Sequence, residues 1–519
     1  MQTHGTESYY VVGEGLLTES VGGRTLAVAA AAPPFRFSRM GPRGQALGEA
    51  NRKKIAQAMT AGGGGTGAIP AGYTYLGQFV DHDLTFDRTQ VTLGQHVSPA
   101  DLLQARSPAL DLDSLYGAGP GDPESAKFFS DDRHLKLGKT AAIDPDPAFE
   151  GHDLPRGAGT TQKAKRRAII PDPRNDENLA VAQTHLAMAR FHNRIVDTLP
   201  VSVPAGQRFA KARELAVKHY QWMLRHDYLP RICEPRILDD VFTNGRKAFE
   251  RNATPTDVPT MPIEFSVAAF RLGHSMVRRD YNWNKRFPGT AGALFFLFDF
   301  SGTSGSLGGF PRLPSNWIAD FRRLYDFVGE AGKANLAAPG GVNHAMRIDT
   351  SLTNPLRFLP KGSFGGNASD EGTIVANLAF RNLARARMVR LATGQGMVAF
   401  LKDRGVNMRA LTKAQIRTGK NGADLDGLTA SQRDGLANNT PLWFYALREA
   451  ELNDGRMRGA GGRILAETFH RAMEGSSHSI VRDTAFRPTF GPDANTFRMV
   501  DLLLFAFEGK KKLLAPLGG

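Results

Sequence analysis

Four polar side chains of the kinds found in active sites stand within six positions of the sequence. They are the amide Gln78, the acids Asp81 and Asp83, and the imidazole His82. Such a mixture suits an apolar core poorly, whereas a histidine can move a proton near neutral pH. Neighbouring carboxylates can orient that histidine, bond to a cofactor or bind a hard cation. The segment is a candidate site, with a polar loop and a hydrogen-bonded histidine as the alternative.

A second segment, residues 107–117, offers oxygen atoms at alternating positions. They belong to Ser107, the Ala109 carbonyl, Asp111 and Asp113. Calcium takes six to eight oxygen ligands in flexible geometry, which fits this spacing. The length and the missing bidentate glutamate exclude an EF-hand. The alternative is a loop of Asx-turns with solvated acids.

A third segment, residues 172–178, places Arg174 and Glu177 just before a long helical pattern. A permanently charged arginine near a helix start is suited to polarising a bound peroxide or anion. A surface ion pair is the alternative. His185 and His192 follow within the helix, and we interpret both as hydrogen-bonded structural residues.

The fourth segment, residues 269–276, carries His274 directly after Gly273 in an apolar setting. A histidine can ligate a haem iron, and a neighbouring glycine lets the backbone come close to the group. A lone histidine on an apolar helix can equally be a satisfied core residue.

Helical periodicity dominates the chain from Asn178 onward. Apolar residues recur at helical spacing over residues 178–199 and 207–225. Further helices are expected near 262–280, 371–391, 396–404, 430–437, 440–450, 463–474 and 499–507. Strand-like alternation is scarce, so we predict a mainly α fold with long ordered loops and few short strands.

The first 70 residues are rich in Gly and Pro, and Gly62–Gly65 marks a loop. We predict an irregular N-terminal extension over residues 1–70 that packs on a single large domain over residues 71–519. The chain of 519 residues shows neither a long polar linker nor an internal repeat.

The formal charge of +14 comes from scattered Lys and Arg. Without aromatic–basic interleaving or zinc-ligand spacing, this charge favours a solvated surface over a nucleic-acid interface. The single Cys233 excludes an internal disulfide and is interpreted as a packed thiol. We find no leader and no run of about 20 apolar residues. The expectation is a soluble protein, cytoplasmic or exported without a classical signal peptide.

Together, the four segments resemble the animal-type haem peroxidases of the peroxidase–cyclooxygenase superfamily, in its bacterial branch. That family includes myeloperoxidase and lactoperoxidase. The resemblance runs from about residue 70 to about residue 400. It implies one large helical haem peroxidase domain with haem b and Ca²⁺.

The resemblance also implies a role for each matched residue. His82, Gln78 and Arg174 match the distal catalytic residues. His274 matches the proximal iron ligand, and Asn382 accepts a hydrogen bond from it. Asp81 and Glu177 match the acids that form esters with haem methyls, and Arg385 approaches a propionate. Asp83, Ser107, Ala109, Asp111 and Asp113 match the calcium ligands.

The implied activity is reduction of H₂O₂ and oxidation of a halide, thiocyanate or small phenol through a ferryl intermediate, in a response to oxidative stress. One alternative is a cyclooxygenase-like fatty-acid dioxygenase. Those enzymes carry a radical-forming Tyr three residues before the proximal histidine, where this chain has Arg271. The other alternative is a haem-binding or nucleic-acid-binding protein without turnover.

Overall fold

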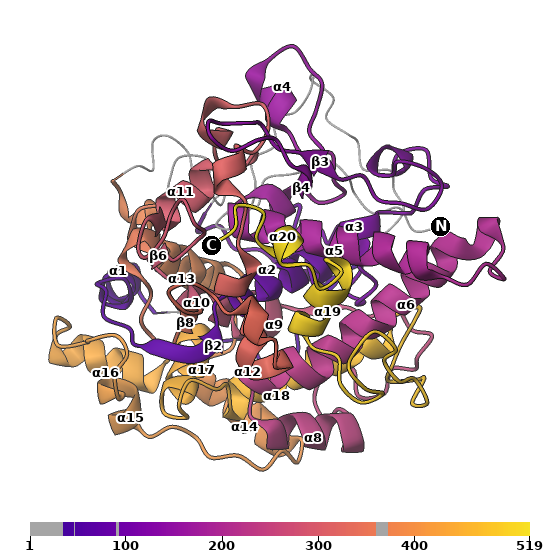
Figure 1. The fold of residues 1–519 in the computed structure, drawn as a ribbon. Helices are drawn as coiled ribbons and strands as arrows, with labels where there is room; N and C mark the ends of the chain where they lie inside the picture. The colour runs from indigo at the N-terminus through magenta and orange to yellow at the C-terminus, as the bar shows by residue number, and fades with distance from the viewer. Residues whose placement is uncertain (1–34, 46, 90–92, 360–371) are drawn as a thin grey trace.

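The computed structural model describes residues 35–45, 47–89, 93–359 and 372–519. Helices make up 46% of the structure and the strands are few and short (Figure 1). The predicted mainly α fold is therefore confirmed. Within the described residues, no helix combines the length and the apolar character needed to cross a bilayer.

The longer helices are joined by extended loops and single helical turns. They are α1 (Glu49–Met59), α2 (Gly72–Leu84), α5 (Leu179–Thr198), α6 (Arg208–Met223), α8 (Pro235–Asn244), α13 (Leu378–Met388), α14 (Gly394–Asp403), α16 (Ala430–Asn438), α17 (Leu442–Glu451), α18 (Gly459–Glu474) and α19 (Met499–Ala506). The shorter ones include α3 (Asp113–Tyr116), α4 (Gln162–Arg166), α7 (Leu229–Ile232), α11 (Leu294–Asp299), α12 (Phe327–Ala331), α15 (Lys413–Thr418) and α20 (Lys511–Leu514).

The strands of the described residues form four two-stranded pairs that tie distant segments together. The parallel pair is β1 (Phe37–Ser38) with β5 (Met261–Pro262). The antiparallel pairs are β2 (Thr66–Pro70) with β8 (His344–Met346), β3 (Gly138–Lys139) with β4 (Glu150–Asp153), and β6 (Asp280–Tyr281) with β7 (Gly292–Ala293).

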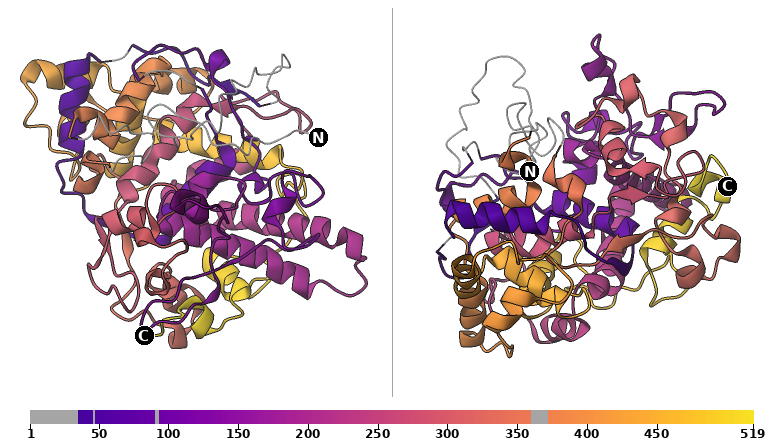
Figure 2. Two further views of the ribbon diagram at one scale, coloured as in Figure 1. Left: turned by 90° about the horizontal axis from the view of Figure 1, so that it is seen from above. Right: turned by 90° about the vertical axis from the view of Figure 1, so that its left-hand side faces the viewer.

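Helix α2 lies at the centre of the molecule (Figure 1). Eleven of its thirteen residues are buried, so it is a core helix without a solvent face. It packs on α5, which in turn packs on α6 and α19. The helices α15 and α16 gather on one flank, far from α4, as two views agree (Figures 1 and 2). The segment expected as either a site or a polar loop is thus a buried helix.

Helix α5 begins at the cap residue Asn178, whose side chain accepts from the Val181 backbone N–H at 2.9 Å. It ends at Leu199, directly before Pro200, because a residue preceding proline avoids the helical conformation. The predictions of helices over residues 178–199 and 207–225 are confirmed.

The last turn of α6 widens into a π-helix, η5 (Leu224–Tyr228). Such a turn inserts one extra residue and often marks a functional site. Here it brings Tyr228 against α2, where a Cβ at Gly77 would meet the Tyr228 hydroxyl at 2.3 Å. Only glycine at position 77 allows this close approach. Cys233, beyond α7, is buried as a packed thiol.

The expected helix near 262–280 is broken into three single turns. They are α9 (Ile263–Ser266), η6 (Ala269–Leu272) and α10 (Gly273–Met276). Ala268 leaves the helical conformation, with φ −134° and ψ −75°, and Val277 is extended. The apolar pattern of this region reflects burial on all sides, so the helix prediction was wrong there.

The expectation of an irregular stretch over residues 1–70 fails for Glu49–Met59, which forms α1. Its buried residues Arg52, Ile55, Ala56 and Met59 recur at helical spacing and pack on α13. The surrounding Gly and Pro residues masked this pattern. Residues 1–34 lie outside the described part of the chain.

The Asp227 carboxylate of η5 joins three elements. It accepts from the Tyr73 hydroxyl of α2 at 2.7 Å and from the Met499 N–H of α19 at 2.9 Å. It also pairs with Arg231 of α7. Each group is buried or half-buried, so loss of the carboxylate leaves donors without acceptors.

We expect Asp227→Ala to lower the free energy of unfolding by about 3 kcal/mol, because a buried hydroxyl and an N–H lose their charged acceptor. Urea unfolding followed by circular dichroism measures this. The control Asp239→Ala removes an exposed carboxylate paired with Arg225 and should change stability by less than about 0.5 kcal/mol. Equal losses of unfolding free energy in both variants would contradict a stabilising role for the Asp227 contacts.

Candidate active site

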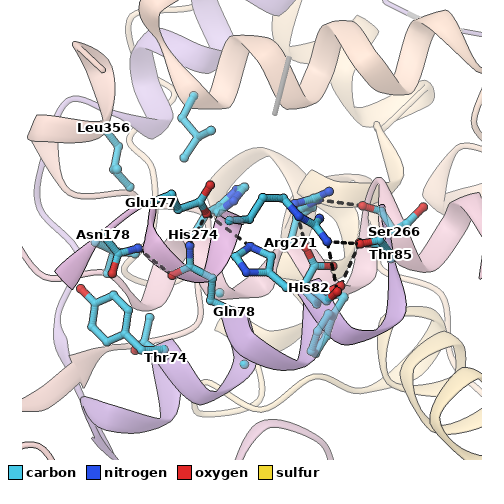
Figure 3. Close-up of a pocket in the computed structure, with 18 of the residues that line it drawn as sticks. Thr74, Gln78, His82, Thr85, Glu177, Asn178, Ser266, Arg271, His274 and Leu356 are labelled. Atoms are coloured by element: carbon cyan, nitrogen blue, oxygen red, sulfur yellow. Dashed lines mark hydrogen bonds and ion pairs between the residues drawn. The ribbon is translucent and has the colours of Figure 1, made fainter. Parts of the chain in front are cut away.

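One cavity lies between α2 and α10 and has about 1100 Å³ of atom-free space, including its open mouth. His82 and His274 both line it. Figure 3 shows Gln78, His82 and Glu177 close together, with Arg271 beside His82.

Helix α2 supplies the polar wall of the cavity. Gln78, Asp81, His82 and Thr85 lie three or four residues apart and therefore share one face. The His82 Nδ1 lies 2.9 Å from the Asn175 Oδ1, and its Nε2 lies 3.3 Å from the Glu177 Oε1. The ring is thus held at both nitrogens.

Gln78, Glu177 and Asn178 form a hydrogen-bonded row along the cavity wall. The Gln78 amide donates to the Glu177 Oε1, and the Asn178 amide donates to the Gln78 Oε1 at 2.9 Å. Asn178 therefore has two functions, since it also caps α5.

Arg174 is fixed by the turn η3 (Pro173–Asp176) and by its own guanidinium bonds. Its Nε and Nη2 donate to the two Asp172 oxygens at 3.0 and 2.7 Å. Nη2 also donates to the His82 and Thr85 carbonyls, and the Phe86 ring lies 4.4 Å from the guanidinium carbon. Within the described residues no hydrogen bond engages Nη1. That nitrogen is left for a molecule in the cavity.

Asp172 is fully buried between two arginines, Arg174 and Arg106. Burial alone would raise the pKa of its carboxyl, but the charges of Arg174 and Arg106 hold that pKa well below its usual range. Burial alone would lower the pKa of the Arg174 guanidinium. The neighbouring Asp172 carboxylate outweighs this effect, so the pKa is raised above its usual value. The pair remains ionised at neutral pH.

The opposite wall carries His274 on α10. Its Nδ1 lies 2.9 Å from the Asn382 Nδ2 of α13. The Asn382 Oδ1 is buried and has no hydrogen-bond partner among the residues that the structure describes, so a half-turn of the amide exchanges the two atoms and lets Oδ1 accept from Nδ1–H. Burial, followed by the charge of Arg271, lowers the pKa of His274 to about 3. The imidazole is therefore neutral, as a metal ligand must be.

Two arginines and two acids complete the polar lining. Arg271 lies 3.5 Å from the Asp81 Oδ2, while the buried Asp81 Oδ1 accepts no hydrogen bond. Arg385 is ion-paired with Asp87. The remaining lining is largely apolar, with Phe37, Phe270, Val277, Leu294, Phe298, Leu356 and Leu378.

Asp83 points away from the cavity to the loop expected to bind calcium. Its two oxygens accept from the Leu112 and Ser114 N–H groups at 3.2 and 3.1 Å. Burial, followed by the charge of Asp113, raises the pKa of Asp83 to about 7. The fold thus brings the His82 segment and the 107–113 loop together.

The other expected calcium ligands are bonded to protein groups. Asp113 pairs with Arg213 at 3.1 Å, and Asp111 accepts from Ser476 at 2.6 Å. The Ser107 hydroxyl accepts from the Ala109 N–H at 3.3 Å. In the part of the chain that the structure describes, no three His, Cys, Asp or Glu side chains converge as a metal site.

Several residues of the site were not predicted from the sequence. Tyr228 lines the cavity from a π-helix, and the periodicity of the sequence does not predict that element. Asp172 and Asn175 stand inside the third segment, but their bonds to Arg174 and His82 depend on tertiary contact. Arg271 was detectable, because it lies one helical turn before His274. His185 and His192 are hydrogen-bonded, as predicted.

The comparison with known families identifies the segment that carries this site. Residues 68–293 match the family model described as animal haem peroxidase. The match covers less than half of the chain. It includes every predicted site residue except Asn382 and Arg385.

Relatives with similar sequences include proteins named as peroxidases. Thyroid peroxidase of Mus musculus is 27% identical over 198 residues, which cover 35% of this chain and 20% of that protein. Heme peroxidase 2 of Caenorhabditis elegans is 25% identical over 181 residues, which cover 33% and 24%. The matched region thus spans about a quarter or less of these relatives' length.

The fold likeness extends beyond the peroxidase domain match. Peroxidase A from Dictyostelium discoideum aligns with a TM-score of 0.55 and 14% identity over 98% of each chain. Fatty acid alpha-dioxygenase of Oryza sativa aligns with a TM-score of 0.53 and 10% identity, over 91% of this chain and 78% of that one. The likeness shows a shared fold that includes the α13 segment.

The cavity fits the haem that the family implies. A neutral His274 faces it, and a Cβ at Gly273 would meet no atom within 4 Å, so the backbone leaves room. Apolar side chains suit a porphyrin face, and Arg271 and Arg385 suit carboxylate groups at its edge. The buried Asp81 Oδ1 adds a polar atom that has no hydrogen-bond partner among the described residues.

We expect Asp172→Asn to lower the free energy of unfolding at pH 7 by about 3 kcal/mol, because two buried guanidiniums lose their counter-charge. The contribution of an acid with a lowered pKa is present above the unfolded pKa of about 3.9 and is lost as the pH falls below it. The difference from wild type should therefore shrink between pH 4 and pH 2.

Urea unfolding over a pH series measures this difference. The control Asp434→Asn, in an exposed pair with Arg417, should show a small difference at every pH. A difference for Asp172→Asn that stays constant down to pH 2 would contradict the lowered pKa.

Proposed function

We propose that this chain is a haem-dependent peroxidase that reduces H₂O₂ and oxidises a small donor. The observation that carries this proposal is the pairing across one cavity. His82 and Arg174 lie on one wall, and the neutral His274, held from behind by Asn382, lies on the other. An acid–base group and a fixed cation thus face a potential iron ligand.

Haem, when bound, would supply an iron centre that is oxidised by peroxide and then oxidises the donor. His274 would hold the group through Nε2, and Asn382 contacts that imidazole at Nδ1 and so would orient it. The His82 Nε2 takes a proton from one peroxide oxygen and returns it to the other, which is general acid–base catalysis. The Arg174 Nη1 stabilises negative charge on the departing oxygen.

Other residues of the cavity have proposed roles in holding the haem. Asp81 and Glu177 both line the cavity and are the candidates for ester bonds to haem methyls. Arg271 and Arg385 would pair with the propionates. Gln78, bonded to Glu177, orders that carboxylate beside His82.

The proposed donors are a halide, thiocyanate or a small phenol. Arginines line the cavity and the chain has a net charge of +14, so anions are favoured at modest ionic strength. The alpha-dioxygenase likeness concerns the fold, and Arg271 stands where a radical-forming Tyr would be expected. We therefore place the dioxygenase reading second.

We also propose a Ca²⁺ site formed by Asp83, Ser107, the Ala109 carbonyl, Asp111 and Asp113. Asp83 and Asp113 are buried, and the charge of Asp113 disfavours ionisation of both Asp83 and Asp111. Excess negative charge in a buried loop supports binding of a hard cation. Such an ion would join the loop to the residue that follows His82.

We expect His274→Ala to abolish the haem Soret band of the reconstituted protein, because the iron loses its protein ligand. His82→Ala should keep the band but slow the reaction with H₂O₂ by about 10²–10⁴-fold, the usual contribution of a general acid–base group. Stopped-flow absorbance measures both. As a control, His192→Gln changes a buried histidine outside the cavity and should behave as wild type.

An unchanged Soret band in His274→Ala would disprove the proximal assignment. Unchanged peroxide kinetics in His82→Ala would disprove the acid–base role. Oxygen uptake with a fatty acid in a protein inert to peroxide would favour the dioxygenase.

We expect Ca²⁺ to raise the thermal midpoint relative to EGTA-treated protein, because a ligand at 100 times its Kd stabilises by about 2.7 kcal/mol. Asp111→Asn should reduce this shift, whereas Asp122→Asn, outside the loop, should retain it. Scanning calorimetry and bound-metal analysis measure the effect. A midpoint that is the same with Ca²⁺ and with EGTA would contradict the site.

A further inference from the structure

Asn175 lies behind His82, on the side of the imidazole away from the cavity. It belongs to η3, between Arg174 and the cavity residue Glu177, and is fully buried. Its Oδ1 lies 2.9 Å from the His82 Nδ1. The same turn therefore supplies a cavity arginine, a cavity acid and the residue that contacts the rear of the histidine.

The orientation of the Asn175 amide is fixed by a backbone carbonyl. Its Nδ2 lies 3.0 Å from the His185 Nδ1 and 3.5 Å from the Ser114 carbonyl oxygen. A carbonyl oxygen only accepts hydrogen bonds, so the amide atom that faces it must be the nitrogen. The amide atom that faces His82 must then be the oxygen.

This orientation determines which His82 nitrogen carries a permanent proton. An amide oxygen only accepts, so the His82 Nδ1 must donate to it. In the neutral ring Nε2 then bears the lone pair, and in the protonated ring the Nε2–H donates to the Glu177 Oε1 at 3.3 Å. Nε2 faces Glu177 and the cavity. The nitrogen that exchanges protons therefore points to where a peroxide would lie.

His185 keeps the amide in place from the other side. Burial lowers the pKa of His185 to about 3, so its ring is neutral and its Nδ1 can accept from Asn175. A protonated His185 would donate there and oppose the observed amide orientation. The ring packs edge-on against Phe79 of α2, with centroids 6.0 Å apart.

We infer that Asn175, held by His185 and the Ser114 carbonyl, is a positioning residue that keeps the His82 proton on Nδ1 and its lone pair toward the cavity. The inference rests on the proposed peroxidase function and assigns roles to two residues outside the cavity lining. His185 acts through Asn175, and neither residue touches the reacting atoms.

The first test measures the bimolecular rate of the haem-loaded protein with H₂O₂. Asn175→Leu removes the acceptor and should slow the reaction by about 10–100-fold, the usual effect of losing a partner that orients a functional histidine. Asn175→Asp keeps an acceptor and should retain most of the rate. His185→Phe should slow the reaction about tenfold, whereas His185→Gln keeps an acceptor and should slow it less.

A second measurement separates proton transfer from access to the iron. Hydrogen cyanide must give its proton to a base when cyanide binds ferric haem, whereas imidazole binds as a neutral ligand. Asn175→Leu should slow cyanide association about tenfold or more and leave imidazole affinity unchanged. The control His192→Gln should match wild type in both. A distorted or blocked cavity would weaken both ligands alike.

The outcomes distinguish this inference from the proposed function. Wild-type rates with peroxide and cyanide in Asn175→Leu would overturn the inference and leave the peroxidase intact. A wild-type protein inert to peroxide would overturn the function, and the cyanide-to-imidazole comparison would still decide the positioning role. Should Asn175→Leu fail to fold, the His185→Phe and His185→Gln pair decides it.

Discussion

The polar side chains on a largely buried helix are the constraint on which the rest of this structure depends. Helix α2 must satisfy the buried His82 and Asp83 with protein groups, while Gln78 and Asp81 line the cavity. Its neighbours supply the required groups. The turn η3 brings Asn175 and Glu177 to His82, while the 112–114 backbone donates to Asp83. The site is therefore built into the core and cannot move independently of it.

The same constraint explains why the turn η3 and its flanking residues position so many side chains of the site. Within six positions, residues 172–177 provide a buried acid, a fixed arginine, an amide and a cavity carboxylate. A 3₁₀ turn directs consecutive side chains about 120° apart, so each reaches a different neighbour. The Asn178 cap then starts α5, whose packing on α2 fixes the turn.

The proximal wall follows a different principle. Short turns, and no long helix, carry His274, because Ala268 and Val277 interrupt the helical path. Support comes from elsewhere: Trp443 of α17 is buried, donates to the Arg271 carbonyl at 3.3 Å and lies edge-on to the His274 ring. Asn382 reaches the same imidazole from α13. A cavity can open here because the segment is held by its neighbours at several points.

The sequence by itself determined the helical class, the long helices α5, α6 and α18, and the residue types of both walls. Local periodicity and capping carry that information, and the four motifs have distinctive composition. Only the tertiary structure decided that Tyr228 enters from a π-helix and that Asn175 contacts His82. The contact of Asn382 with His274, 108 positions away, was implied by the family resemblance and not by any local pattern. The tertiary structure also showed α1 where the surrounding glycines suggested irregular chain. The periodicity of a sequence shows which residues share one face of a helix or strand. Which faces of different elements then contact one another depends on how the whole core packs.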